Sequence, residues 1–174
     1  MRASDPATID LDVFVLRSGQ AKTVELTLEP EPPVVNGETL AFADPEVDAR
    51  VDISRTTSGY ALRLRLATAL TGVCSSCLGP ARWDLAIDAR EVDQASENDP
   101  ELLSPYVTDG VLDAASWVRD AIVLALPERL LCRPGCLGLC EECGINLNEV
   151  DPPGSHTHEK PLDPRFAKLR DLQG

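Results

Sequence analysis

Hydrophobic and polar residues alternate along much of the first half of the chain, as they do in β-strands with one buried face. Turn-forming residues separate the later alternating segments, first Gly59 and then the pair Gly79 and Pro80. Repeated period-two patterning of this kind predicts a mainly antiparallel β-sheet, arranged as a partly open barrel. The predicted strands cover residues 9–15, 24–28, 47–53, 62–66 and 83–90.

The pattern changes to a helical period after residue 113. Trp117, Ala121 and Leu124 fall on one face of a helix predicted over residues 114–126, and this face should pack on the sheet. Asp113 is suited to cap the helix at its N-terminus. A proline at position 127 ends it. The predicted fold class is therefore α+β, with a mainly antiparallel sheet and one packed helix.

Two segments in the rest of the chain lack apolar periodicity. Residues 91–110 are rich in acidic residues and contain two prolines, which favours a mobile acidic loop or a docking surface for a basic partner. Residues 132–143 are rich in glycine and cysteine, and a short final helix is expected from Asp163. We expect a β-rich domain over residues 1–131 and a C-terminal segment organised by a zinc knuckle over residues 132–174.

Composition narrows the classes of partner. The 174 residues carry a net charge of −13, which disfavours broad binding of phosphate backbones and suits a basic protein partner or a solubilising surface. Local positive charge is limited to Arg63, Arg65 and residues 129–133, which are better placed to solvate the sheet and the helix end than to bind RNA. The N-terminus has no signal-peptide pattern and no stretch suits a membrane span, so we expect a cytoplasmic protein.

A reducing compartment favours metal ligation over disulfides for the six cysteines. The cysteines and histidines fall into four pairs, two of them with the Cys-x2-Cys spacing at which two thiolates reach one ion. Eight donors match the coordination of two tetrahedral zinc ions. From the sequence we expect one or two structural zinc ions. The predicted ligands are Cys74, Cys77, Cys132, Cys136, Cys140, Cys143, His156 and His158.

Other chemistry fits the chain less well. A thiol-redox role for Cys74 and Cys77 would place them at the start of a helix, whereas a turn and a strand follow them here. Solvated surface histidines would give the same sequence pattern as His156 and His158. Cys–His catalysis would need a cysteine outside any pair, and every cysteine here belongs to one. Phosphate-binding, dinucleotide-binding and hydrolase motifs are absent. We therefore predict closed, structural zinc sites and a protein that is not an enzyme.

Beyond these spacings, the chain resembles the YceD family of large ribosomal RNA subunit accumulation proteins. The resemblance extends over most of the chain and is most specific between residues 122 and 148. It is carried by Val111, Leu112 and Asp113, by residues 122–127, by Leu131, Cys132 and Cys136, by residues 138–140, by Cys143, Gly144, Asn146, Leu147 and Asn148, by Cys74, Cys77, Leu78 and Gly79, and by residues 163–169.

The resemblance implies a role in the synthesis, processing or stability of 23S rRNA, with a basic large-subunit ribosomal protein or an rRNA assembly intermediate as partner. It also implies one ligand set of Cys74, Cys77, Cys132 and Cys136 and a second of Cys140, Cys143, His156 and His158. Related sequences often carry Cys-x-Cys where this chain has two histidines. An alternative division places the four cysteines from residue 132 to residue 143 on one ion.

Two other functions remain open on the sequence alone. One is a thiol-redox or metal-dependent enzyme, which would lose turnover on a single substitution while its fold survived. The other is a zinc-stabilised protein-binding module unrelated to ribosomes.

Overall fold

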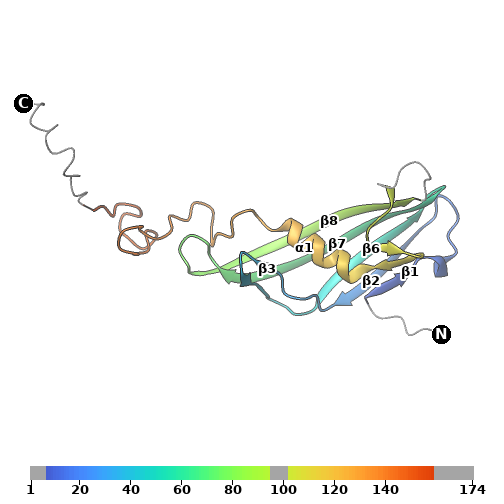
Figure 1. The fold of residues 1–174 in the computed structure, drawn as a ribbon, viewed down its shortest axis with the longest axis horizontal. Coiled ribbons are helices and arrows are strands. Elements are labelled where there is room, and N and C mark those ends of the chain that lie inside the picture. The colour runs from blue at the N-terminus through green and yellow to red at the C-terminus, as the bar shows by residue number, and fades with distance from the viewer. Residues whose placement is uncertain (1–6, 95–101, 159–174) are drawn as a thin grey trace, which may run out of the picture.

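The computed structural model describes residues 7–94 and 102–158 as an elongated molecule built on one antiparallel sheet (Figure 1). Strand β7 lies in the middle of this sheet and pairs with β6, β5 and β8, while β2 pairs with the far side of β6. The strands are β2 (Ala21–Leu28), β5 (Ala41–Phe42), β6 (Val47–Arg55), β7 (Gly59–Val73) and β8 (Pro80–Gln94).

The long hairpin of β7 and β8 dominates the sheet. Its ladder runs without a break from the pair Gly59–Gln94 to the pair Val73–Pro80. Both strands are longer than the predicted segments 62–66 and 83–90, because polar residues such as Thr68 and Thr71 of β7 and Arg82 and Gln94 of β8 continue the pairing. Within the predicted part, the leucines of β7 are buried and the intervening arginines lie on the opposite, more exposed face. Antiparallel pairing with one buried face is thus confirmed.

A small three-stranded sheet joins the N-terminus to the segment before the helix. It contains β1 (Thr8–Asp10), β9 (Val107–Thr108) and β10 (Val111–Asp113) in the order β1-β10-β9. A further pair, β3 (Val34–Val35) and β4 (Glu38–Thr39), lies beside one end of the main sheet (Figure 1). The sequence patterns predicted none of the short strands β3, β4, β5, β9 and β10.

The first predicted strand, 9–15, is wrong in its second half. Strand β1 stops at Asp10, whose Oδ1 accepts a hydrogen bond from the backbone N–H of Asp12 at 3.0 Å. A short 3-10 helix (Asp12–Phe14) follows and ends at Val15 with a φ of 45°. Val13 and Val15 are consequently 68% and 85% exposed, although their alternation matches that of a buried strand face.

Helix α1 (Ala114–Ala125) forms where the sequence predicts it and packs against β8 and β1. Asp113 caps it as expected, since its Oδ1 accepts from the backbone N–H of Ser116 at 3.0 Å. Leu126 is extended, in agreement with the steric effect of the following proline. The predicted apolar face is only partly correct: Trp117 and Ala121 are buried, but Leu124 is 83% exposed.

The remaining predictions concern closure of the sheet, the acidic loop, the final helix and membrane-spanning segments. The described strands do not close into a barrel, because β2 and β8 each pair with one neighbour, so the partly open barrel stays a prediction. The predicted acidic loop is shorter at both ends, since β8 includes residues 91–94 and β9 lies at 107–108. Its residues 95–101 and the final helix from Asp163 lie outside the described residues. No described helix has the length and apolarity needed to cross a membrane.

Candidate metal centres

The turn that closes the β7–β8 hairpin carries the first Cys-x2-Cys pair, Cys74 and Cys77. The backbone N–H of Cys74 donates to the carbonyl of Gly79 at 2.8 Å, and the N–H of Leu78 donates to the carbonyl of Cys74 at 3.0 Å. Leu78 has a φ of 57°, a left-handed conformation that a side chain makes costly. This tight turn brings both sulfur atoms to the same side of the chain.

The second Cys-x2-Cys pair, Cys140 and Cys143, has the same backbone pattern. The N–H of Cys140 donates to the carbonyl of Ile145 at 2.8 Å, and the N–H of Gly144 donates to the carbonyl of Cys140 at 2.9 Å. Gly144 occupies the left-handed position with a φ of 73°, which costs glycine little. The two turns are therefore equivalent in geometry, and the residue after the second cysteine is their main difference.

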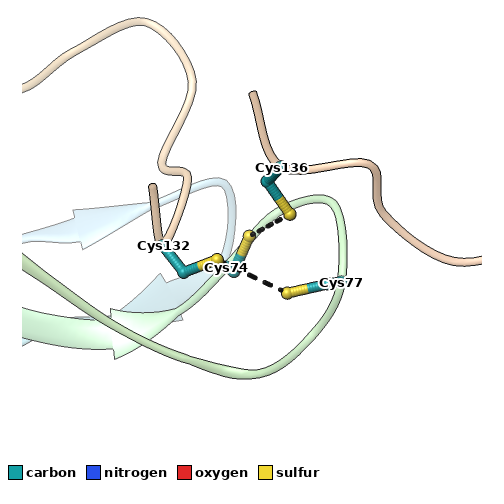
Figure 2. Close-up of side chains that lie close together, drawn as sticks. All are labelled: Cys74, Cys77, Cys132 and Cys136. Atoms are coloured by element: carbon teal, nitrogen blue, oxygen red, sulfur yellow. Dashed lines mark hydrogen bonds between the residues drawn. The ribbon is translucent and has the colours of Figure 1, made fainter. Parts of the chain in front are cut away.

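Cys132 and Cys136 reach the first turn from the segment that follows α1. This segment is tied to the end of the hairpin by two hydrogen bonds: the indole N–H of Trp83 donates to the carbonyl of Leu131 at 2.9 Å, and the N–H of Ser75 donates to the carbonyl of Leu130 at 2.8 Å. Figure 2 shows the four cysteine side chains pointing toward one another from the two segments. We call this group the first cluster.

The sulfur spacing of the first cluster fits a tetrahedral metal ion. The Sγ atoms of Cys74 and Cys136 lie 3.8 Å apart, and those of Cys77 and Cys132 lie 3.7 Å apart. Sulfur atoms bound tetrahedrally to zinc at about 2.3 Å are separated by about 3.8 Å. A disulfide would require about 2.0 Å. The four thiols thus suit a shared thiophilic cation better than pairwise oxidation.

The second cluster joins the second turn to His156 and His158. Sγ of Cys140 lies 3.2 Å from Nε2 of His158, and Sγ of Cys143 lies 3.2 Å from Nε2 of His156. The two Nε2 atoms are 2.8 Å apart, which is closer than the roughly 3.3 Å expected for two nitrogens bound to one tetrahedral zinc ion. Opening this cluster by a few tenths of an ångström would fit the same ion. Nδ1 of His158 faces a carboxylate oxygen of Glu142 at 3.4 Å.

The thiols of the first cluster share their charge unevenly. Burial opposes ionisation of Cys74, but backbone N–H groups, led by that of Cys77, lower its pKa to about 6. Burial and the neighbouring thiols raise the pKa of Cys132 to about 12. In the second cluster the backbone N–H groups of Cys143 and Glu142 lower the pKa of Cys140 to about 7. Each cluster therefore contains a thiol whose pKa is lowered from its ordinary value, and a divalent ion would favour ionisation of the remaining thiols.

All eight donors predicted from the sequence lie in these two groups, and within each group the ligand atoms lie within 4.8 Å of one another. The grouping is the one that the family resemblance implied. The alternative set of four cysteines between residues 132 and 143 is split, two to each cluster. Such donor sets are compatible with metal binding, and thiolate with imidazole suits zinc.

Sequence reasoning missed the side chains that support the clusters. Nδ2 of Asn148 donates to Sγ of Cys136 at 3.5 Å, and the carboxylate of Glu142 faces His158. Asn148 stands among the residues that carry the family resemblance, but with no role assigned to it, and the only signal for Glu142 was its position within the second Cys-x2-Cys turn.

Comparison with known proteins identifies related chains. The model of the family described as "Large ribosomal RNA subunit accumulation protein YceD" matches residues 62–173, a range that includes both clusters. An uncharacterized protein of Mycobacterium tuberculosis, Rv2926c, is 30% identical over 182 aligned residues, which cover 98% of this chain and 83% of the relative.

Two further relatives match shorter segments. The uncharacterized protein ML1660 of Mycobacterium leprae is 43% identical over 67 residues, or 38% of this chain and 29% of the relative. A maize protein named "Large ribosomal RNA subunit accumulation protein YCED homolog 1, chloroplastic" is 38% identical over 60 residues, or 34% of this chain and 20% of its own length. No solved structure matches the chain.

Proposed function

Since the chain belongs to the YceD family of large ribosomal RNA subunit accumulation proteins, we propose that it is a non-catalytic, zinc-binding factor in ribosome biogenesis. It supports the synthesis, processing or stability of 23S rRNA in the cytoplasm. The single observation that carries this proposal is the family match over residues 62–173, which spans most of the β7–β8 hairpin, α1 and all eight donors.

Geometry supports a structural role for the metal. Each cluster offers four protein donors, which complete a tetrahedral zinc site and leave no position for an activated water. A zinc ion in the first cluster would be held by Cys74, Cys77, Cys132 and Cys136. It would supply a cross-link between the hairpin turn and the chain after α1. The proposed role is therefore stabilisation rather than hydrolysis.

The thiol-redox alternative has one supporting feature, the lowered pKa of Cys74. A redox thiol must also be reached by its substrate. Cys74 is 0% exposed, and its sulfur lies among three other cysteine side chains. Burial of this thiolate argues against exchange with an external disulfide and for a ligand role.

Charge favours a protein partner over direct contact with RNA. Nε of Arg63 donates to Asp88 at 2.7 Å, and Arg65 pairs with Asp52, so these two arginines of the open sheet face each lie against a carboxylate. The arginines near the first cluster also make internal bonds: Arg129 donates to Ser76 and Arg133 donates to Asn148. On a chain with a net charge of −13, these contacts support a basic large-subunit ribosomal protein, or an assembly intermediate that contains one, as the partner.

Depletion of the protein in its native host tests the ribosomal role. We expect the ratio of 23S to 16S rRNA to fall and free large subunits to decline in sedimentation profiles. Re-expression of the natural chain should restore both, as should Thr157→Ala, a change at an exposed residue between the two histidines. Unchanged rRNA ratios and profiles after depletion would refute the proposal.

Affinity capture of the tagged chain at low salt, followed by mass spectrometry, tests the partner. A basic large-subunit protein should be recovered and should be lost as the salt concentration rises. Recovery of partners with no link to ribosomes would instead favour a zinc-stabilised binding module of another kind.

A further inference from the structure

The two clusters are neighbours along one stretch of chain. Cys136 of the first cluster and Cys140 of the second are separated by three residues, and Gly138 among them packs against the first hairpin turn. Leu139 donates its N–H to the carbonyl of Ser76 at 3.2 Å, so the strand entering the second turn also touches the first. The clusters are thus joined by a short segment that packs on the first turn.

Asn148 links the two clusters, because its backbone directly follows the hairpin that contains the second turn. Leu139 and Asn146 form a β-bridge across the base of this turn, and Leu147 donates to the carbonyl of Gly138 at 2.9 Å. The N–H of Asn148 donates to Oδ1 of Asn146 at 3.1 Å. The position of Asn148 therefore depends on the hairpin that the second Cys-x2-Cys pair closes.

The side chain of Asn148 nevertheless serves the first cluster. Nδ2 donates to Sγ of Cys136 at 3.5 Å and to Oδ1 of Asn146 at 2.7 Å. Oδ1 accepts from the N–H of Leu137 and from Nη2 of Arg133, each at 2.9 Å. An asparagine amide has two donor hydrogens and two acceptor lone pairs, and all four are used here. One saturated amide thus fixes the loop on both sides of Cys136 and donates to its sulfur.

We infer that Asn148 is a positioning residue that couples the two clusters, so that a metal ion bound in the second cluster strengthens metal binding in the first. An ion on Cys140, Cys143, His156 and His158 would order the hairpin that presents Asn148. The amide then holds the loop carrying Cys136 and stabilises its thiolate by a hydrogen bond. Coupling free energies are reciprocal, so filling the first cluster strengthens the second by the same factor.

The inference rests on the proposed metal sites, and its test uses the full chain with cobalt(II) as a probe. A site of four thiolates and a site of two thiolates with two imidazoles give distinct visible spectra, so the two affinities can be read separately in competition with a chelator. Asn148→Ala should lower the first-cluster affinity about 10- to 100-fold, as loss of an outer hydrogen-bond partner does at other metal sites.

Two further variants isolate the role of the amide. Asn148→Asp keeps the acceptor for Leu137 and Arg133 but has no N–H for the sulfur, and it should also weaken the first cluster. The double change His156→Ala with His158→Ala removes the second site and should weaken the first to a similar extent. Adding Asn148→Ala to this double variant should cause no further loss of first-cluster affinity, because both changes break the same connection.

Separate outcomes overturn separate claims. First-cluster affinity that is unchanged in Asn148→Ala, unchanged in Asn148→Asp, or reduced additively in the combined variant would overturn the coupling while leaving both metal sites in place. Absence of cobalt binding by the natural chain would overturn the coupling together with the zinc part of the proposed function, but would leave the ribosomal role to the depletion experiment. Circular dichroism of each variant checks that the β-sheet is retained.

Discussion

The two clusters use the same backbone turn but differ in what they connect. In the first, the paired sulfurs of Cys74 and Cys136 come from positions 62 residues apart, and the site lies at the end of the main sheet. In the second, Cys140 and His158 are 18 residues apart, and the site lies beyond the sheet in the extended C-terminal part of the described chain (Figure 1). A cross-link over a longer segment removes more freedom from the unfolded chain. The first cluster should therefore contribute to global stability, and the second mainly to local order.

The largest expected effect comes from breaking the first cluster. Cys74→Ser removes a fully buried ligand, and the lost metal cross-link should lower the free energy of unfolding by more than about 4 kcal/mol, a fraction of what zinc contributes in small zinc-dependent domains. Urea denaturation of the reduced protein measures this change. A chelator should destabilise the natural chain to the same extent and the variant very little.

Cys143→Ser is the matched control, since it makes the same chemical change at an exposed ligand of the second cluster. We expect the denaturation midpoint of the sheet to fall much less than in Cys74→Ser, because only the coupling to the first cluster is lost. Hydrogen exchange should accelerate mainly in the C-terminal part of the described chain. Equal destabilisation by the two serine variants would contradict the proposed division of roles.

A smaller effect is expected where the hairpin holds the ligand segment. Trp83→Phe keeps an aromatic ring but removes the indole donor to the carbonyl of Leu131, leaving that acceptor unpaired. This should cost about 1–2 kcal/mol of stability and weaken metal binding at the first cluster alone. Cobalt titration gives both affinities. A matching loss at the second cluster would mean that Trp83 supports the whole C-terminal segment.

A change in the helix cap should weaken the sheet body without altering either cluster. Asp113→Ala removes the acceptor for Ser116 and should cost about 1 kcal/mol. The hydrogen bond from the backbone N–H of Ser116 holds the pKa of Asp113 below its ordinary value. The cap stabilisation is therefore complete above a pH of about 4 and is lost as the pH falls through the lower folded-state pKa.

Denaturation of the natural chain and Asp113→Ala, both with chelator, should accordingly converge in strong acid. A difference between them that persists there would show that the cap acts through packing rather than through its charge.

The smallest expected effect concerns the residue that follows the second cysteine of each turn. Leu78→Gly replaces a 65% exposed side chain at a φ of 57° and should stabilise the first turn by up to about 1 kcal/mol, since glycine adopts this conformation without strain. Gly144→Leu is the reciprocal change and should weaken the second cluster. Thermal melts and cobalt affinities report the two effects. Destabilisation by Leu78→Gly would indicate that the exposed leucine makes contacts worth more than the strain.

Much of this architecture is present in the sequence as local pattern. Alternation predicts the centres of the main strands because a half-buried strand must present one apolar face. It predicts neither the ends of β7 and β8, where Thr68 and Thr71 continue the ladder, nor the exposure of Val13 and Val15, whose backbone turns away after Asp10. Those outcomes depend on which strand is available to pair, and pairing is a property of the whole chain.

For the candidate site too, the sequence predicts the local turns but not the contacts between distant segments. Cys-x2-Cys spacing identifies each turn, because two nearby thiolates and a curled backbone are enough to define it. The partners of the first turn, Cys132 and Cys136, follow α1 and are held near this turn by the anchor at Trp83, which no spacing encodes. Asn148 carries no spacing signal of its own, and its contact with Cys136 emerges only when the second hairpin folds against the first cluster.

The unbroken hairpin of β7 and β8 also fixes a length scale. A strand of 15 residues spans roughly 45 Å at about 3.3 Å per residue. The cysteine turn lies at one end of this rod, and Glu91 and Asp93 lie near the other. A small ligand cannot reach both ends. A partner that contacted both would therefore need to be a macromolecule of comparable extent.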